Sequence, residues 1–282
     1  MDLTVQSDHR GQRVPSTLDS LLREATLDAE LAALLSLLVE ARVPLVVAGH
    51  VEPPVRAGVL EALLEPLPED VRRIRLAGAT EDFAWLPEAE SLGWRADGPT
   101  PGRDPLEPAT PDATMLVAGD LTTAAGGAPW AGVVRIAVRA ISLGYGFAAT
   151  IDDGSLEEVF ETLRASPFRV TDDELSRLGA VVILAPSGRV APTIVAAHYV
   201  RPVARDMHGH VQRLGPAVLA TGDPASGRFE HFGWGVTPEL ALRTGRRAGD
   251  FEIELDRRRD AFGARVGGDP PADPRPAVGG TP

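Results

Sequence analysis

The segment from Leu45 to Pro68 reads as a strand, a short loop and a helix, and a loop in this setting can bind phosphate. In the motif G-x-x-x-x-G-K-[ST], backbone amides cradle the phosphates, a lysine reaches the β- and γ-phosphates, and a hydroxyl holds Mg²⁺. The loop here reads GHVEPPVR, from Gly49 to Arg56. Val55 stands at the lysine position and Arg56 at the hydroxyl position. The frame of the motif is present, but the residues that carry its chemistry are not.

The inner part of the loop is also unsuited to phosphate. Pro53 and Pro54 have no N–H to donate, and Glu52 would repel an anion. Arg56 could imitate the lost lysine, because a guanidinium binds phosphate well, although it stands one position further along. The chain has no lysine and no asparagine, so all 28 basic residues are arginine. This bias indicates a GC-rich genome, which does not by itself explain the simultaneous loss of the glycines and the hydroxyl.

Composition limits the classes of function. The formal net charge of −12 argues against a dedicated nucleic-acid surface and against a basic helix on a membrane. No segment reaches the roughly 20 apolar residues of a membrane span, and the first residues lack the apolar core of a signal peptide. We therefore expect a cytoplasmic protein that does not insert into a membrane, with a place at the inner face of the membrane left open. The absence of cysteine excludes disulfides and thiolate metal sites.

Strands alternate with helices along most of the chain, which predicts an α/β fold with a mostly parallel sheet flanked by helices. Apolar runs predict strands over 44–49, 73–79, 114–120 and 147–152, and a hairpin at the sheet edge over 179–201. Helices are expected over 16–42, after the loop, over 130–146 and over 155–166, with caps at Asp28 and Ser155. Residues 95–112, rich in Pro, Gly and Asp, predict a surface loop.

Four regions follow from this pattern. Residues 1–15 are polar and are expected to be disordered. Residues 16–205 form the predicted core, and 206–265 a small α+β annex with a charged helix. Residues 266–282 are a Pro/Gly tail that cannot bury a core.

The order of these segments resembles the secretion and pilus-assembly ATPases of the type II/type IV superfamily, and within it the tight-adherence pilus branch. Three stretches carry the resemblance: STLDSLLREATLDAELAALLSLLVEARVPLVVAG before the loop, AVRAISLGYGFAATIDDGSLEEVFETL at the family's histidine box, and RLGAVVILAPSGRV at its closing strands. The resemblance implies a P-loop NTPase-like (RecA-like) core. It also implies ATP hydrolysis with Mg²⁺ for an intact member.

The resemblance places the nucleotide site on specific residues, most of them altered. Gly49 matches the first glycine of the loop, with Val55 and Arg56 in place of lysine and threonine. The acidic box falls on Gly78 and Ala79, with Glu81 and Asp82 close by. The glycine and acid after the third strand are Gly119 and Asp120. The two histidine positions are Tyr145 and Asp152, the latter followed by Asp153. Of this site, Asp120 alone keeps its chemistry, as a ligand for Mg²⁺ if nucleotide binds.

Several of these residues also have purely structural interpretations. Asp120 could cap a loop, and Asp152 and Asp153 could begin a turn before the Ser155 cap. His208 and His210, with His231 further along, could bind a metal, but their spacing favours a solvated loop. Two arginines on the helix before the histidine box, Arg135 and Arg139, could reach across a subunit interface or pair with surface acids. The four tryptophans are expected to serve in packing or at an interface.

These observations predict a degenerate member of the family, a pseudo-ATPase without cofactor, whose vestigial nucleotide site comprises Gly49, Val55, Arg56, Gly119, Asp120, Tyr145 and Asp152. We expect it to act as a structural or regulatory subunit with a paralogous secretion ATPase or an inner-membrane platform protein, in a homo- or hetero-oligomer. The alternative is an unconventional NTPase that binds ATP and Mg²⁺ through Asp120 and Arg56.

Overall fold

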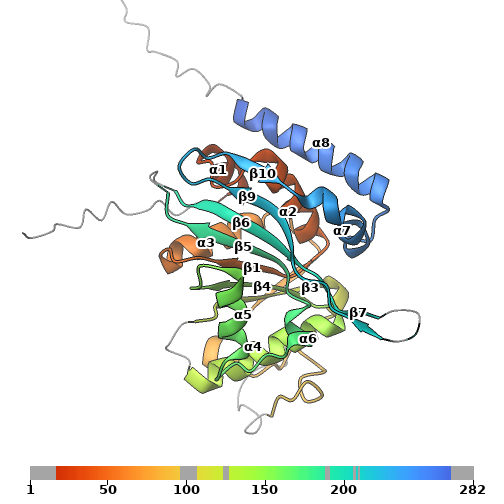
Figure 1. Ribbon diagram of the computed structural model, residues 1–282. Coiled ribbons are helices and arrows are strands. Elements are labelled where there is room, and N and C mark those ends of the chain that lie inside the picture. Colours follow the sequence, from red (N-terminus) through yellow and green to blue (C-terminus); the bar gives the residue numbers. More distant parts are fainter. Residues whose placement is uncertain are drawn as a thin grey trace, which may run out of the picture.

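The computed structural model describes residues 17–95, 107–122, 127–187, 191–205, 208 and 210–267. These form an eight-stranded sheet with helices on both faces (Figure 1). The strands of the sheet are β1 (Leu45–Ala48), β2 (Arg72–Arg75), β3 (Thr114–Asp120), β4 (Gly146–Ile151), β5 (Gly179–Ala185), β6 (Thr193–Val200), β9 (Ala217–Gly222) and β10 (Phe229–His231), and β7 (Ala204–Arg205) pairs separately with β8 (Val211–Gln212). The α-helices are α1 (Leu18–Arg23), α2 (Ala29–Glu40), α3 (Pro53–Leu63), α4 (Gly127–Ala140), α5 (Leu156–Arg164), α6 (Asp172–Leu175), α7 (Thr237–Arg243) and α8 (Ala248–Gly267). The predicted disordered N-terminus and most of the predicted tail and surface loop lie outside the described residues.

The sheet is parallel in one half and antiparallel in the other, in the order β10-β9-β6-β5-β1-β4-β3-β2. The pairs from β5 to β2 are all parallel, and those from β5 to β10 are all antiparallel. β1 reads LVVA and is buried along its whole length, as expected of a parallel strand covered on both faces. The predicted α/β fold with a mostly parallel sheet flanked by helices is confirmed.

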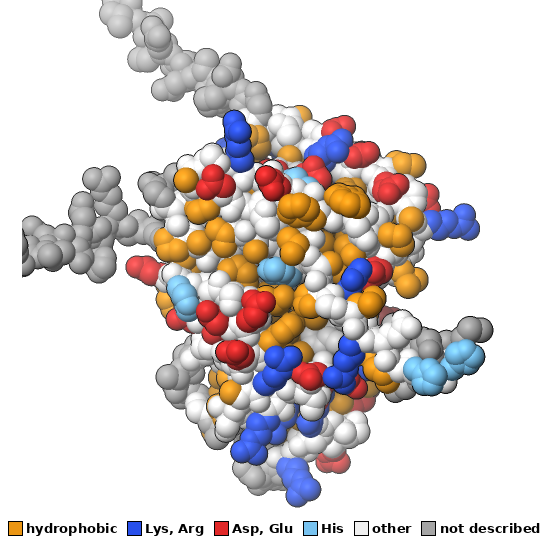
Figure 2. Space-filling view, viewed as in Figure 1, with side chains coloured by type: hydrophobic (Ala, Val, Ile, Leu, Met, Phe, Trp, Pro, Cys, Tyr) orange, Lys and Arg blue, Asp and Glu red, His pale blue; other side chains and the backbone are white. Residues whose placement is uncertain are grey.

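Two hydrophobic layers cover the two faces of the sheet. One is built from α1, α2, α3, α7 and α8, and includes Val55 and Phe251. The other is built from α4, α5 and α6, and includes Trp130 and Val159. On the face seen in Figure 2, hydrophobic side chains also lie at the surface over the antiparallel strands, where Val218 of β9 is 39% exposed. The parallel half therefore carries the full three-layer arrangement.

Local sequence signals explain several helix ends. The Asp28 side chain accepts a hydrogen bond from the backbone N–H of Leu31, and Ser155 does the same for Glu158, so both predicted caps are confirmed. Thr17 caps α1, because its side chain accepts a hydrogen bond from the backbone N–H of Ser20. None of the described helices is long and apolar enough to cross a membrane.

The C-terminal third differs from its prediction. The hairpin of β5 and β6 forms, but it does not lie at the sheet edge, because β6 also pairs with β9. β9 and β10 continue the main sheet, and α8 packs against α2, a helix of the N-terminal region. A separate annex over 206–265 is therefore not confirmed.

The strand order creates a topological switch point at the carboxyl end of β1, the position that forms a crevice in open α/β sheets. The chain leaves β1 through α3 on one face and runs to β2 at the far edge; it leaves β4 through α5 and α6 on the other face to reach β5. The loops after the adjacent strands β1 and β4 therefore diverge to opposite faces. In open α/β sheets, such switch points at the carboxyl ends of strands are where ligands bind.

Candidate functional site

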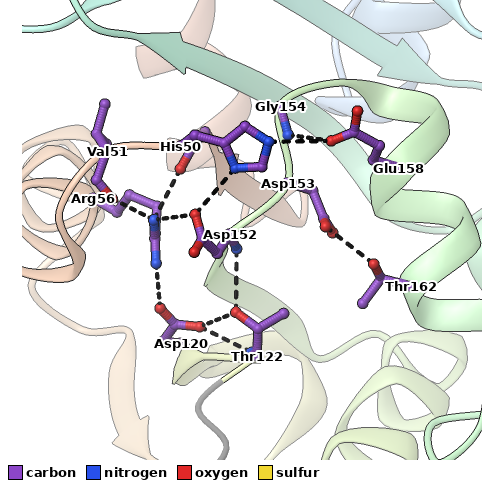
Figure 3. Close-up of polar contacts among 11 residues, drawn as sticks. His50, Val51, Arg56, Asp120, Thr122, Asp152, Asp153, Gly154, Glu158 and Thr162 are labelled. Carbon is purple, nitrogen blue, oxygen red and sulfur yellow. Dashed lines mark hydrogen bonds and ion pairs between the residues drawn. The ribbon is translucent and has the colours of Figure 1, made fainter.

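A buried arginine occupies the crevice at the carboxyl end of β1. Arg56, in the first turn of α3, is 1% exposed, and its guanidinium makes four hydrogen bonds (Figure 3). It donates to the carbonyl oxygens of Gly49, at 2.9 Å, and Val51, and to the carboxylates of Asp152, at 2.8 Å, and Asp120, at 2.7 Å. The guanidinium thus lies between the loop after β1 and the ends of β3 and β4.

Of the eight residues from Gly49 to Arg56, five have no N–H group left for a ligand. Pro53 and Pro54 occupy the first helical positions of α3 and have no N–H. The N–H of Val51 donates to the carbonyl of Gly49, and those of Val55 and Arg56 both donate to the carbonyl of Glu52. In a phosphate-binding loop the amides face the ligand. Here the loop directs carbonyl oxygens toward the site, and the Arg56 guanidinium donates hydrogen bonds to two of them, those of Gly49 and Val51.

Asp120 reaches Arg56 because β3 bulges immediately before it. The register between β3 and β4 shifts between Val117 and Asp120, and Gly119, inside this irregularity, has a φ of +55°. The second carboxylate oxygen of Asp120 accepts hydrogen bonds from the N–H and the hydroxyl of Thr122, at 2.9 and 2.7 Å. Both oxygens of Asp120 are therefore occupied by protein donors.

The loop after β4 completes the network. Asp152 accepts from Arg56, its own N–H donates to the Thr122 hydroxyl at 3.3 Å, and the imidazole of His50 lies 3.3 Å from its carboxylate. His50 also lies 3.5 Å from Glu158 at the start of α5. The network thus joins three strand ends that are far apart in the sequence.

Asp153 faces away from this network. Its carboxyl is 8% exposed and accepts a hydrogen bond from the Thr162 hydroxyl of α5 at 3.1 Å (Figure 3). Burial raises the pKa of this carboxyl, and the neighbouring Glu158 and Asp152 raise it further. The chain bends at Gly154 and Ser155, after these aspartates. The two aspartates differ in environment, because Asp152 is half exposed.

Four of the seven predicted site residues meet in the crevice: Gly49, Arg56, Asp120 and Asp152, with Gly119 beside them in the chain. Gly49 has a structural reason to be glycine, because a Cβ at this position would lie 2.3 Å from the carbonyl oxygen of Leu184 on β5. Val55 is wholly buried in the hydrophobic layer and does not line the crevice.

Tyr145 does not belong to this site. It precedes β4, at the opposite end of the strand from Asp152, and its side chain is 1% exposed. Its hydroxyl donates to the carbonyl of Ala109 at 3.0 Å and lies 3.4 Å from Glu88. The two positions expected to form a histidine box therefore lie at opposite ends of β4, and the grouping of Tyr145 with the nucleotide site is wrong.

The acids near the predicted acidic box serve local structure. Gly78 and Ala79 lie in the 3-10 turn η1 (Gly78–Thr80). Glu81 is 6% exposed and accepts hydrogen bonds from the N–H groups of Ala77 and Phe83 and from the Trp85 indole. Its carboxylate is thus held in the turn and is not directed at the crevice.

The arginines and histidines outside the crevice lie in separate environments. Arg139 pairs with Glu174 at 2.7 Å and donates to the carbonyl of Leu92, so it serves intramolecular packing, whereas the Nε of Arg135 is buried without a hydrogen-bond partner. His208 and His210 are exposed, and His231 pairs with Asp28 at 2.8 Å instead of joining them. Within the described ranges no three His, Cys, Asp or Glu side chains are arranged to hold a metal ion.

Two side chains that contact Asp120 or Asp152, those of His50 and Thr122, were not predicted as site residues. His50 stands inside the loop and Thr122 follows Asp120 by two positions. An Asp followed two residues later by Thr is a recognisable turn signal, because the carboxylate can accept from that residue's N–H. For His50, the only sequence signal of a place in the site is that it directly follows Gly49, the retained glycine of the loop.

The arrangement fits a structural role, in which Arg56 links the ends of β1, β3 and β4, better than it fits phosphate binding. A nucleotide would need free amides and a cation at the crevice, together with a carboxylate open to Mg²⁺. Here five of the eight loop residues have no N–H group left for a ligand, two carboxylates and two carbonyls accept from the Arg56 guanidinium, whose buried Nε has no partner, and both Asp120 oxygens are occupied. The residues present do not fit ATP and Mg²⁺ in this conformation.

Comparison with known proteins gives a distant similarity. No protein-family model matches the chain, and no curated protein sequence matches it. Among solved structures, the fold is similar to that of the VirB11 ATPase from the Brucella suis type IV secretion system, determined in complex with sulphate, at 17% identity and a TM-score of 0.33. The match covers 74% of this chain and 53% of that one, so it spans about half the length of the VirB11 protein. These values do not establish membership of a family.

Proposed function

We propose that this protein is a non-hydrolysing relative of the secretion and pilus-assembly ATPases that acts as a structural or regulatory partner of an active ATPase or of its membrane platform. The observation that supports this most directly is the buried Arg56 guanidinium, which fills the crevice where the family binds nucleotide. The family relation itself rests on the sequence resemblance of the segments around β1, β4 and β5.

Electrostatics argue against phosphate at this position. The single cation Arg56 is paired with two carboxylates, those of Asp120 and Asp152, and a third carboxylate, Glu158, lies 3.5 Å from His50 beside them. Two unit charges 4 Å apart interact by about 4 kcal/mol near a protein surface, so several carboxylates oppose a triphosphate strongly. Displacing Arg56 to serve the ligand would break four hydrogen bonds and leave Asp120 without its cation.

A thermal melt with and without millimolar Mg²⁺-ATP, together with a phosphate-release assay, tests this proposal. A ligand at a hundredfold its Kd adds about 2.7 kcal/mol of stability, which is readily seen as a shift in Tm. We expect no shift and no release. Affinity capture from the native cell should then recover a secretion ATPase or a platform protein.

One observation favours a second candidate, an unconventional NTPase. Arg56 and Asp120, the two groups that such an enzyme would use, lie 2.7 Å apart at the crevice. If the ion pair opened on binding, the arginine could clamp phosphate and the aspartate could hold Mg²⁺. A Mg²⁺-dependent shift in Tm that disappears in Asp120→Ala would establish this candidate and overturn the first.

A further inference from the structure

A pocket of about 260 Å³ that shares no lining residue with the Arg56 network lies between α2, β9, β10, α7, α8 and the 3-10 turn η5 (Gly233–Val236). Its floor is apolar and is made of buried side chains that include Leu219, Leu240 and Phe251. Figure 2 shows hydrophobic and acidic side chains side by side at the surface near β10, α7 and α8.

A tryptophan at the edge of this pocket is left in solvent. Trp234, in η5, is 79% exposed, whereas Trp85 and Trp130 are 2% and 6% exposed. A large aromatic side chain gains most from burial, and tryptophan is enriched among the residues that dominate binding interfaces. The exposed indole beside an apolar hollow therefore indicates a contact surface for another molecule.

Carboxylates determine which chemical group fits this surface. Glu30, Glu252 and Asp256 line the pocket, and Asp28 lies next to it. Two cationic groups oppose them: His231, which pairs with Asp28 at 2.8 Å and lies 3.8 Å from Glu30, and Arg259, which pairs with Asp256 at 2.8 Å. Four carboxylates thus face two cationic groups, even when His231 is protonated. Glu252, an exposed residue of α8, has no partner in this group.

We propose that the pocket binds the side chain of an arginine presented by a basic segment of a partner protein. The guanidinium would stack on the Trp234 indole and pair with the carboxylates of Glu30 and Glu252, while its aliphatic stem would cover the apolar floor. A second copy of this chain is a poorer occupant, because two copies that each carry a net charge of −12 repel one another. This inference does not depend on the proposed function, because the pocket lies on other elements than the crevice.

The experiment uses two short peptides as probes of the full chain. Acetyl-Leu-Arg-Leu-amide carries the guanidinium, and acetyl-Leu-citrulline-Leu-amide replaces it with a neutral group of nearly the same shape. Titration calorimetry at low salt should show saturable binding of the arginine peptide, about tenfold or more tighter than binding of the citrulline peptide. Tryptophan fluorescence should respond in the same titration, because Trp234 is far more exposed than Trp85 and Trp130.

Matched variants locate the binding. The double variant Glu30→Gln/Glu252→Gln should weaken binding of the arginine peptide about tenfold. Glu161→Gln, which removes an exposed charge from α5 on the other layer, should leave it unchanged. Equal affinity for the two peptides, or equal affinity of the double variant and the control, would overturn the proposal. So would a dimer in sedimentation experiments that dissociates in Trp234→Ala, because it would assign the surface to a second copy.

Discussion

Replacing Arg56 by methionine tests whether the buried guanidinium stabilises the loops at the carboxyl ends of β1, β3 and β4. The substitution keeps a long side chain but removes all four hydrogen bonds of the guanidinium. Asp120, whose side chain is 15% exposed, loses its ion pair and retains the bonds from Thr122. Asp152 is 51% exposed and regains water. The carbonyls of Gly49 and Val51 lose their partner within the protein.

The magnitude follows from these environments. The loss at Asp120 is worth about 2 kcal/mol and each carbonyl about 1 kcal/mol, whereas the half-exposed Asp152 adds less than about 1 kcal/mol. The free energy of unfolding should therefore fall by about 4 kcal/mol, within the roughly 3–5 kcal/mol typical of breaking a buried ion pair. Chemical denaturation followed by circular dichroism measures this difference, with the midpoint and the slope fitted separately.

Arg75→Met is the matched control, because Arg75 pairs with Glu61 at 2.8 Å while 68% of its side chain is exposed. It should cost less than about 1 kcal/mol. Adding Asp120→Asn to Arg56→Met should restore part of the lost stability, because it removes the unpaired carboxylate. A loss of less than about 1 kcal/mol in Arg56→Met would refute the reasoning, since it would mean that the guanidinium is solvated.

Three further predictions concern other parts of the fold. Gly49→Ala should destabilise the protein by about 3 kcal/mol, because φ is +143° at this position and the added Cβ would clash with Leu184. Gly119→Ala should cost about 1–2 kcal/mol, because φ is +55° but the added Cβ meets open space. Denaturant midpoints of the two variants measure the difference. His231→Gln should lower the stability of the protein at acidic pH. Burial lowers the pKa of His231, but the hydrogen bond to Asp28 and its charge outweigh this effect and raise the pKa in the folded state. The stability that His231 contributes is therefore fully present below pH 6.5 and is lost as the pH rises through the higher folded pKa, and thermal melts across this range measure the change. Burial raises the pKa of Tyr145 to about 12 and also raises that of Tyr199. At about pH 10.5 the folded chain, which has two tyrosines, should therefore show less tyrosinate absorbance than the unfolded chain, and equal absorbance would contradict the buried placement of both.

The parallel half of the fold could be predicted from local patterns, because each of its elements is specified by nearby residues. The run Thr114–Asp120 forms a strand with the predicted bounds, and the Asp28 and Ser155 caps form as expected. The antiparallel extension could not be predicted, because β10 has three residues and no clear alternation. Its place in the sheet depends on pairing with β9, which is a tertiary contact.

The candidate site was only partly predictable for a similar reason. Which strand ends carry Gly49, Asp120 and Asp152 follows from the order of the elements. The direction of the Arg56 side chain could not be predicted, because it points toward carbonyls and carboxylates that come from three separate segments of the chain. A local sequence pattern does not show that these segments meet. Tyr145 was misplaced because its role came from aligned position in a family motif, while the strand β4 separates it from Asp152 by its full length.

The two outer strands of the main sheet bear on how the protein meets other chains. β2 and β10, at its two ends, have four and three residues, and β2 reads RRIR. Short edge strands with charged side chains resist the addition of a further strand from another molecule. In the described part of the chain, the exposed main-chain edges are thus protected against uncontrolled polymerisation. Association through strand pairing is disfavoured, and a partner that recognises this protein is expected to do so through side chains.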